Sequence, residues 1–427
     1  MSKFRAPLLQ AEADLRKAHR EIKADALKDV GDPILVKGKV IRMIVRDQDA
    51  WTTESTAIVR RINLQTGETL QIYRGHSAPV TCLAFYTVER GGKTSELLIT
   101  GSWDKTIRIW DTETKECVST TDAHDDFLKS ICVIPSLRLV ASGASDKSIR
   151  MWDLSVLSSS PASQLLHVGT FTGHTRPVEC LSVDGAPRFA AEEEYATITE
   201  NLRLYSADSM GVIKIWSLDI STRASGALSI RGNVVRENKA HRTGINDMVV
   251  SNGQIWTGST DYSVIIQGNC STDDEPSPTV EVMSPKTITH PSLVRAVLPL
   301  PLVHVDEPYL ISGSADKIFV WDITSVNQKH GVIEKVVELD AHSHDVTAIE
   351  FWEQAPKGKS GISEIWIVTA GLDCMVRRWR LKDILNGTYQ RQVDAALKLD
   401  KSRRTPPSAT ITEEEERELE ELMSSDD

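Results

Sequence analysis

The chain has 427 residues, with 49 Lys and Arg against 60 Asp and Glu, and a net charge of −11. Hydrophobic residues make up 40% of it, enough for a packed core, but no apolar run approaches the ~18 residues of a membrane-spanning helix. Residues 411–427 hold nine acidic residues and one Arg, a net −8, which leaves −3 for the rest of the chain. The body therefore has no overall basic footprint, which disfavours nucleic acid as a partner.

The N-terminus lacks the apolar segment of a secretory signal, so we expect a cytoplasmic or nuclear protein. The six Cys residues form no Cys-x-x-Cys pair and no cluster with His. We therefore expect reduced thiols rather than a zinc site or disulfides.

The first element in chain order is a helix. Leu8, Ala11, Leu15, Ala18 and Ile22 fall alternately three and four residues apart, which is the spacing of one helix face. Gly31-Asp32-Pro33 would end such a helix. Two interpretations of the apolar stripe stay open: it packs against the body of the protein, or it docks on a partner or a second copy.

A pattern then repeats along the chain. Thr100-Gly-Ser-Trp-Asp-Lys-Thr-Ile-Arg-Ile-Trp-Asp returns as Ser142-Gly-Ala-Ser-Asp-Lys-Ser-Ile-Arg-Met-Trp-Asp, and four weaker copies follow. Each copy joins two short apolar runs across a Gly/Ser/Asp turn, which predicts a β-hairpin. A His lies upstream of each copy, at His76, His124, His174, His241, His290 and His342.

The recurring His, Ser/Thr, Asp and Trp can form a buried chain of hydrogen bonds that satisfies all four polar groups. With its Gly-His and Trp-Asp signatures, the pattern resembles the WD40-repeat β-propellers over residues 33–380. A further unit at residues 40–64 lacks the His and the Trp-Asp, and it brings the total to seven.

The resemblance implies an all-β fold with a single seven-bladed propeller. We expect an N-terminal helix and linker in residues 1–32, the propeller in 33–380, and an extension in 381–427 that ends in a short acidic helix or tail. In this family the outer strand of the last blade often comes from the N-terminus, and residues 33–37 are placed to supply it.

Three copies depart from the pattern. Met210 stands where Asp is expected and Asp208 lies two residues early, so we expect the hydrogen-bond chain of blade four to be broken. Gln267 replaces the Trp of blade five. Blade six lacks one residue between Asp316 and its Trp.

The longest insertions include residues 86–96 and 218–231, and they fall on one rim of the expected propeller, the bottom. The opposite rim, which we call the top, consists of the His loops and the Asp turns, and these are short. The two rims therefore favour two different interaction surfaces.

The C-terminal extension carries most of the net charge. Residues 381–400 have a mixed helical pattern, and residues 402–408 have the composition of a linker. Thr412 and Glu415 fit a capping box, followed by Leu419, Leu422 and Met423 at helical spacing. The segment is either a solvated tail or a motif that docks into a basic partner.

No arrangement of residues favours catalysis. The His/Ser/Asp sets resemble hydrolase triads, but they repeat in most blades and are better explained as structural networks. Gly91-Gly92 is not followed by the helix of a phosphate-binding loop. His342 belongs to the repeat, so we interpret His344 as a surface residue rather than a metal ligand. We predict a protein that is not an enzyme and has no cofactor and no metal.

In the WD40 family, two rings of top-face residues commonly hold peptides and partner domains. One ring lies five residues after each His and the other lies just before each turn Asp, and both have neighbours in the His loops. The partner-binding residues predicted in this way are Trp103, Phe127, Lys129, Arg176, Glu179, Arg242, Asn246 and Arg295.

The charges among these residues favour an acidic or phosphorylated segment, which Lys129, Arg242 and Arg295 would receive. Two alternatives stay open. Trp103 could merely pack over an adjacent loop, and the cations could be scattered surface charges.

These features favour a scaffold or adaptor of a multiprotein complex that binds other proteins on its top rim and through its terminal segments. A substrate receptor of a cullin-RING ubiquitin ligase is an alternative, weakened because no Trp-Asp-x-Arg occurs. An RNA-processing or ribosome-biogenesis factor is another, weakened by the charge of the body. The fold by itself names neither the pathway nor the oligomeric state.

Overall fold

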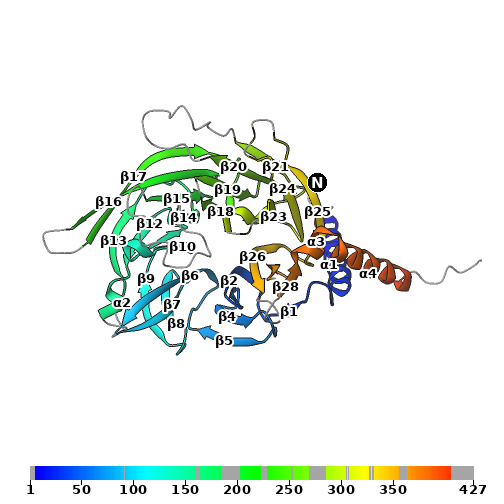
Figure 1. The fold of residues 1–427 in the computed structure, drawn as a ribbon, viewed down its shortest axis with the longest axis horizontal. Coiled ribbons are helices and arrows are strands. Elements are labelled where there is room, and N and C mark those ends of the chain that lie inside the picture. The colour runs from blue at the N-terminus through cyan, green and yellow to red at the C-terminus, as the bar shows by residue number, and fades with distance from the viewer. Residues whose placement is uncertain are drawn as a thin grey trace, which may run out of the picture.

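Seven four-stranded antiparallel sheets surround a central axis as the blades of a propeller (Figure 1). The computed structural model describes residues 5–90, 92–159, 164–183, 202–222, 228–251, 253–268, 285–303, 305, 307–326, 328, 331–354 and 363–404. The prediction of a seven-bladed propeller with an N-terminal helix is confirmed. The acidic segment predicted at the C-terminus lies outside the described residues.

Each blade runs outward from an inner strand at the axis. Blades one to three comprise β2–β5 (Val40–Arg46, Asp49–Glu54, Ile58–Asn63, Thr69–Arg74), β6–β9 (Val80–Arg90, Lys93–Ser102, Thr106–Asp111, Cys117–Asp122) and β10–β13 (Leu128–Ile134, Leu139–Ala144, Ile149–Asp153, Leu166–Phe171). Blades four to six comprise β14–β17 (Val178–Val183, Arg203–Asp208, Val212–Thr222, Leu228–Lys239), β18–β21 (Ile245–Ser251, Gln254–Ser259, Ser263–Gly268, Lys286–Thr289) and β22–β25 (Val294–Pro299, Tyr309–Ser314, Lys317–Asp322, Glu334–Asp340).

Blade seven closes the ring with strands from both ends of the chain. Its inner strands are β26 (Val346–Gln354), β27 (Glu364–Gly371) and β28 (Met375–Arg380), and its outer strand is β1 (Ile34–Leu35). Ile34 pairs with Val376 and Leu35 with Met375. The prediction that residues 33–37 supply this strand is therefore confirmed, and the pairing covers an edge that an open sheet would expose.

The core lies between neighbouring blades, where the apolar faces of successive sheets pack. The largest fully buried side chains include Trp51, Trp216, Trp256 and Trp379. Close packing leaves little room for a larger side chain at some positions. A Cβ on Gly101, for example, would lie 2.3 Å from a methyl group of Leu128 in the next blade.

Helices α1 (Arg5–Ala26), α3 (Leu381–Leu385) and α4 (Thr388–Arg404) lie together on the outer side of blades six and seven (Figure 1). The C-terminal end of α1 packs against the propeller, where Lys23, Ala26, Leu27 and Val30 are buried. Upstream, Leu15 is 71% exposed, so the described part of the predicted apolar stripe is largely uncovered. Three shorter helical turns are η1 (Pro135–Leu137), α2 (Val156–Ser159) and η3 (Leu300–Val303).

The prediction of loops on the bottom rim is wrong for two segments, which form strands instead. Residues 86–96 belong mostly to the extended pair β6 and β7, and residues 218–231 belong in their described part to β16 and β17. The predicted linker at 402–408 also begins too early, since α4 continues to Arg404. None of the described helices is long and apolar enough to span a bilayer.

Candidate functional site

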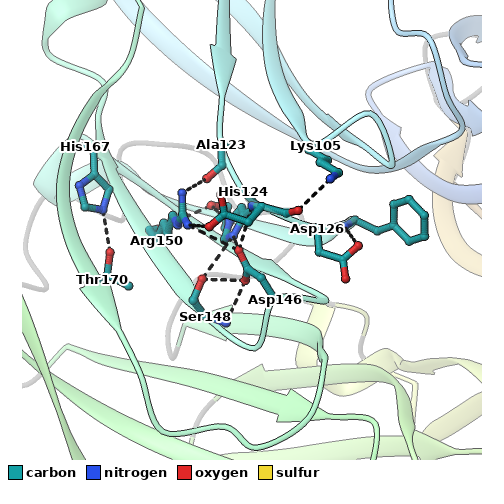
Figure 2. A network of polar contacts seen from close by, with 12 residues as sticks. Lys105, Ala123, His124, Asp126, Asp146, Ser148, Arg150, His167 and Thr170 are labelled. Atoms are coloured by element: carbon teal, nitrogen blue, oxygen red, sulfur yellow. Dashed lines mark hydrogen bonds and ion pairs between the residues drawn. The ribbon is translucent and has the colours of Figure 1, made fainter.

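In blades two, three, four and seven, the top rim rests on a buried chain of hydrogen bonds. In blade three, His124 Nδ1 lies 2.9 Å from Asp146 Oδ2, and its Nε2 lies 2.8 Å from Ser142 Oγ (Figure 2). Trp152 Nε1 donates to the same hydroxyl over 2.8 Å. Equivalent sets form in blades two and seven, through His76, Thr100, Asp104 and Trp110 and through His342, Thr369, Asp373 and Trp379.

Blade four contains the same network, so the prediction that it is broken is wrong. His174 Nδ1 lies 3.0 Å from Asp208 Oδ2 and its Nε2 lies 2.7 Å from Ser206 Oγ, which accepts the Trp216 indole N–H. Asp208 Oδ1 accepts the backbone N–H groups of Met210 and Val212. The carboxylate therefore reaches His174 from the end of β15 rather than from the turn.

Blades five and six keep only part of the network. In blade five, His241 contacts Asp261 and Thr257, but Gln267 supplies no indole to the Thr257 hydroxyl. In blade six, His290 Nε2 lies 2.7 Å from Ser312 Oγ, whereas its Nδ1 meets no carboxylate among the described residues.

The shared hydroxyl has no access to a substrate. Ser142 is fully buried, accepts the Trp152 N–H and donates to the Arg150 carbonyl over 3.3 Å. Burial by itself would raise the pKa of Asp146, but hydrogen bonds from His124 and Ser148 hold it well below its usual range. The set therefore fixes the Asp turn against the His loop and does not form a hydrolytic centre.

Three of the residues singled out from the sequence lie together on the rim of blades two and three. Trp103 is 38% exposed and Phe127 is 44% exposed, and their rings stack with centroids 5.3 Å apart. Lys129 Nζ lies 5.9 Å from the Trp103 ring centroid, within cation–π range. Backbone hydrogen bonds hold both aromatic residues, from Trp103 N to Pro79 O and from Ser145 N to Phe127 O.

The position five residues after each His joins neighbouring blades. Lys129 forms an ion pair with Glu179 at 3.5 Å, and Arg295 forms one with Asp345 at 3.0 Å. Asn246 Nδ2 donates to the Val294 carbonyl over 2.7 Å. Equivalent bonds run from Thr81 Oγ1 to Leu128 O and from Thr347 Oγ1 to Val40 O. These side chains, predicted to line the channel mouth, are thus engaged between blades.

An ion pair also spans the central channel. Arg42 of blade one donates to the Asn246 carbonyl over 2.7 Å and to Asp247 Oδ1 over 3.3 Å, both in blade five. Arg42 and Asp247 line a central cavity of about 920 Å³ together with residues of the other inner strands. Sequence alignment of the repeats missed Arg42 because blade one has no His from which to count.

The open part of the top rim lies on blades two to five. Arg176 and Arg242 are exposed and form no ion pair with other described residues. Met210 is 41% exposed and Tyr262 is 53% exposed. We call this surface the top-rim arc, and it consists of Trp103, Phe127, Arg176, Met210, Arg242 and Tyr262.

The arc is continuous where blades four and five meet. Ser209 N donates to Pro177 O within blade four, and Ala240 N of the next blade donates to Gly211 O. Gly211 has φ +81°, and a Cβ there would lie 2.3 Å from the His241 carbonyl oxygen. The turn that presents Met210 is therefore packed against the loop that presents Arg242.

Comparison with known proteins agrees with this architecture. Residues 67–111 and 115–153 match the family model "WD domain, G-beta repeat". The chain is a WD40-repeat β-propeller. No narrower subfamily within the WD40 proteins is identified.

Several WD40 relatives resemble it along much of their length. The propeller is 26% identical to an uncharacterized WD repeat-containing protein of Schizosaccharomyces pombe, over 87% of this chain and 83% of that protein. It is 23% identical to the target of rapamycin complex subunit wat1 of the same yeast, over 68% and 76% of the two chains. The structure of the designed Ika8 protein aligns with a TM-score of 0.51 and 18% identity, over 81% and 98%, which shows the fold alone.

Sequence reasoning missed two members of the arc in this WD40 propeller. Met210 was interpreted as a defect in the repeat, and Tyr262 follows a turn Asp, a position outside both predicted rings. Both residues could have been found from the sequence because each is a large apolar or aromatic side chain in a short turn, as Trp103 is. Among the described residues, no three His, Cys, Asp or Glu side chains are grouped as metal ligands.

Proposed function

We propose that this WD40 propeller is a non-enzymatic scaffold or adaptor in a multiprotein complex and that the top-rim arc is its partner site. The observation that carries the proposal is the exposed, stacked pair of Trp103 and Phe127 on short, hydrogen-bonded loops. Aromatic side chains held in this way bury a large area with little loss of conformational freedom, which is why they dominate binding energy at interfaces.

The arc favours a partner segment with both acidic or phosphorylated and apolar side chains. Arg176 and Arg242 are exposed beside Met210 and Tyr262. Lys129 and Arg295, which were expected to receive the acid, are already paired with Glu179 and Asp345. We therefore assign the first anionic contacts to Arg176 and Arg242, whose guanidinium groups suit bidentate pairing.

The terminal segments are the second attachment surface in this proposal. Leu15 on α1 is exposed above a helix end that is docked on the propeller, and helices α3 and α4 follow blade seven up to Arg404. A relative whose name places it in a target of rapamycin complex supports a role within an assembly. We propose the cytoplasm or the nucleus as the compartment.

The test compares proteins that co-purify with tagged chains from native cells, measured by quantitative mass spectrometry. The first variant is Trp103→Ser/Phe127→Ser, and the matched control is Leu166→Ser/Ile220→Ser. The control pair is 47% exposed at both positions and lies on strands β13 and β16 of blades three and four. Thermal melts verify that all forms fold.

We expect the Trp103/Phe127 variant to lose at least one stable partner that the control and the wild type both keep. If both variants keep every partner, the top-rim arc is not the binding surface. If both lose the same partner, the contact depends on exposed apolar area in general and the assignment to the arc fails.

A further inference from the structure

We propose that the acidic C-terminal segment of this chain, residues 413–427, docks on its own top-rim arc and competes there with partner proteins. This inference rests on the proposed function, since it adds a regulatory occupant to the same site. Residues 405–427 lie outside the described part of the structure. The occupant is therefore argued from its charge, its apolar residues and the point where its tether begins.

The first argument is the charge of the arc. The Asp residues of the rim turns are engaged with the His loops, as Asp104 is with His76 and with the Ser77 N–H. The exposed Asp125 is paired with Arg150 at 2.6 Å. Arg176 and Arg242 form no ion pair with other described residues, so the arc presents two exposed guanidinium groups to an acidic segment.

The second argument is the composition of the segment. It holds nine acidic residues against Arg417, and its apolar residues Leu419, Leu422 and Met423 lie within the acidic run. The arc offers the complement, with guanidinium groups beside the exposed side chains of Met210 and Tyr262. Charge and apolar contact would act together, as in other acidic motifs that bind basic, partly apolar surfaces.

The third argument is the place where the tether starts. Val393 is fully buried and Leu397 packs against the apolar core of blades six and seven, so α4 is fixed to the propeller until its last two turns. Blade five, which carries Arg242 and Tyr262, is the next blade along the ring from blade six. From Arg404, residues 405–427 can extend up to about 75 Å.

Because the segment belongs to the same chain, weak contacts are enough to keep it bound to the arc. A linker of this length gives an effective concentration of about 1 mM. At that concentration, a segment that binds in trans with a Kd of about 100 µM is about 90% docked in cis. A partner must then compete with it, which lowers the apparent affinity of the partner about tenfold.

The experiment uses purified protein and a fluorescently labelled peptide of residues 405–427. Fluorescence polarisation measures its binding to the full chain and to a chain that ends at Arg404. The test variant is Arg176→Glu/Arg242→Glu, and the matched control is Lys115→Glu/Arg138→Glu, which reverses two exposed charges in turns of the bottom rim. A second peptide carries Gln at positions 413–416, and thermal melts verify folding of each protein.

We expect the peptide to bind the shortened chain with a Kd at or below about 100 µM and the full chain about tenfold more weakly, because its own segment competes. The Arg176/Arg242 variant, the Gln peptide and 300 mM salt should each weaken binding at least about tenfold. The bottom-rim control should bind as the unaltered shortened chain does.

Absence of binding at 1 mM peptide, or equal binding by the Arg176/Arg242 variant, overturns the inference. Either result leaves the proposed function intact, because the Trp103/Phe127 comparison measures partner loss independently of the peptide. Conversely, the peptide could bind while the Trp103/Phe127 variant keeps every partner. That result would refute the arc as a partner site but support the contact between the arc and the C-terminal segment.

Discussion

Lys23 of α1 and Asp316 of blade six form an ion pair in which Nζ and Oδ2 lie 2.5 Å apart, and the same ammonium lies 2.6 Å from Asp340. Blade six is one residue short in its turn, and Asp316 does not contact His290 as its counterparts contact theirs. The carboxylate that the turn would have used within the blade instead holds the N-terminal helix. A departure from the repeat thus creates the anchor of α1.

Because Lys23 is only 5% exposed, its removal should leave Asp316 without its cation and Asp340 with only the more distant Lys317, at 3.7 Å. We expect Lys23→Met to lower the free energy of unfolding by about 3 kcal/mol, measured by urea denaturation. Lys17→Met, at an exposed position of the same helix, should change it by less than about 0.5 kcal/mol. Adding Asp316→Asn and Asp340→Asn to Lys23→Met should recover part of the loss, and additive losses would contradict the assigned pairing.

Arg42 gives a second test, with a control on its own strand. Asp247 is 2% exposed at the side chain, so Arg42→Met leaves a buried carboxylate without its cation and should cost about 2–4 kcal/mol of stability. Arg46→Met breaks the more exposed pair with Glu96 and the contact of the guanidinium with the Phe85 ring, and it should cost about 1 kcal/mol or less. If urea denaturation gives equal losses in the free energy of unfolding for the two variants, the cross-channel pair contributes no more to stability than the exposed pair.

Two Gln residues of blade five should respond in opposite directions to the same substitution. The buried Gln267 Nε2 has no hydrogen-bond partner among the described residues and lies near Ile213, Ile215 and Ile255, while Gln267 Oε1 accepts from Asn238 Nδ2, a half-buried amide that can bind water instead. Gln267→Met should therefore raise the free energy of unfolding by about 1 kcal/mol. Gln254→Met should lower it by about 1–2 kcal/mol, because the buried Trp256 N–H loses its acceptor Gln254 Oε1. A loss at both positions would refute the account of Gln267.

His290 predicts part of the acid sensitivity. Burial lowers the pKa of His290 from 6.5 to about 4. Between those pH values the unfolded chain binds a proton that the folded chain does not, so stability falls as the pH falls from about 6.5 towards 4. His290→Gln should reduce the stability lost between pH 7 and pH 5 by about 2 kcal/mol. His19→Gln, at an exposed position of α1, should leave that loss unchanged.

The fold was predictable from sequence because each blade repeats both a strand pattern and a set of polar residues. Asp208 shows the limit of counting residues. Its side chain reaches His174 from the end of β15 because the following turn contains Gly211 at positive φ, which lets the backbone return to meet the same carboxylate. Spacing along the chain carries no information on such a change of side-chain direction.

The site was less predictable because its partners are distant in sequence. Repeat alignment placed Lys129 and Arg295 at the channel mouth, but it could not show that Glu179 and Asp345 of the next blades neutralise them. It did place Trp103 and Phe127 on the same rim, and the structure shows that their rings stack where blades two and three meet. The rim on which a side chain lies was thus accessible from sequence, whereas its contacts with the next blade required the structure.

The pairing of β1 with β28 also sets an order of events during protein synthesis. Ile34 leaves the ribosome before the other strands of the propeller, yet its partner Val376 emerges only after six blades and most of the seventh have been made. Until then the growing protein is an open arc with an unpaired strand at one end, which is a template for misassociation. Closure is therefore the contact with the longest sequence separation in the sheets and should be a late, slow step of folding.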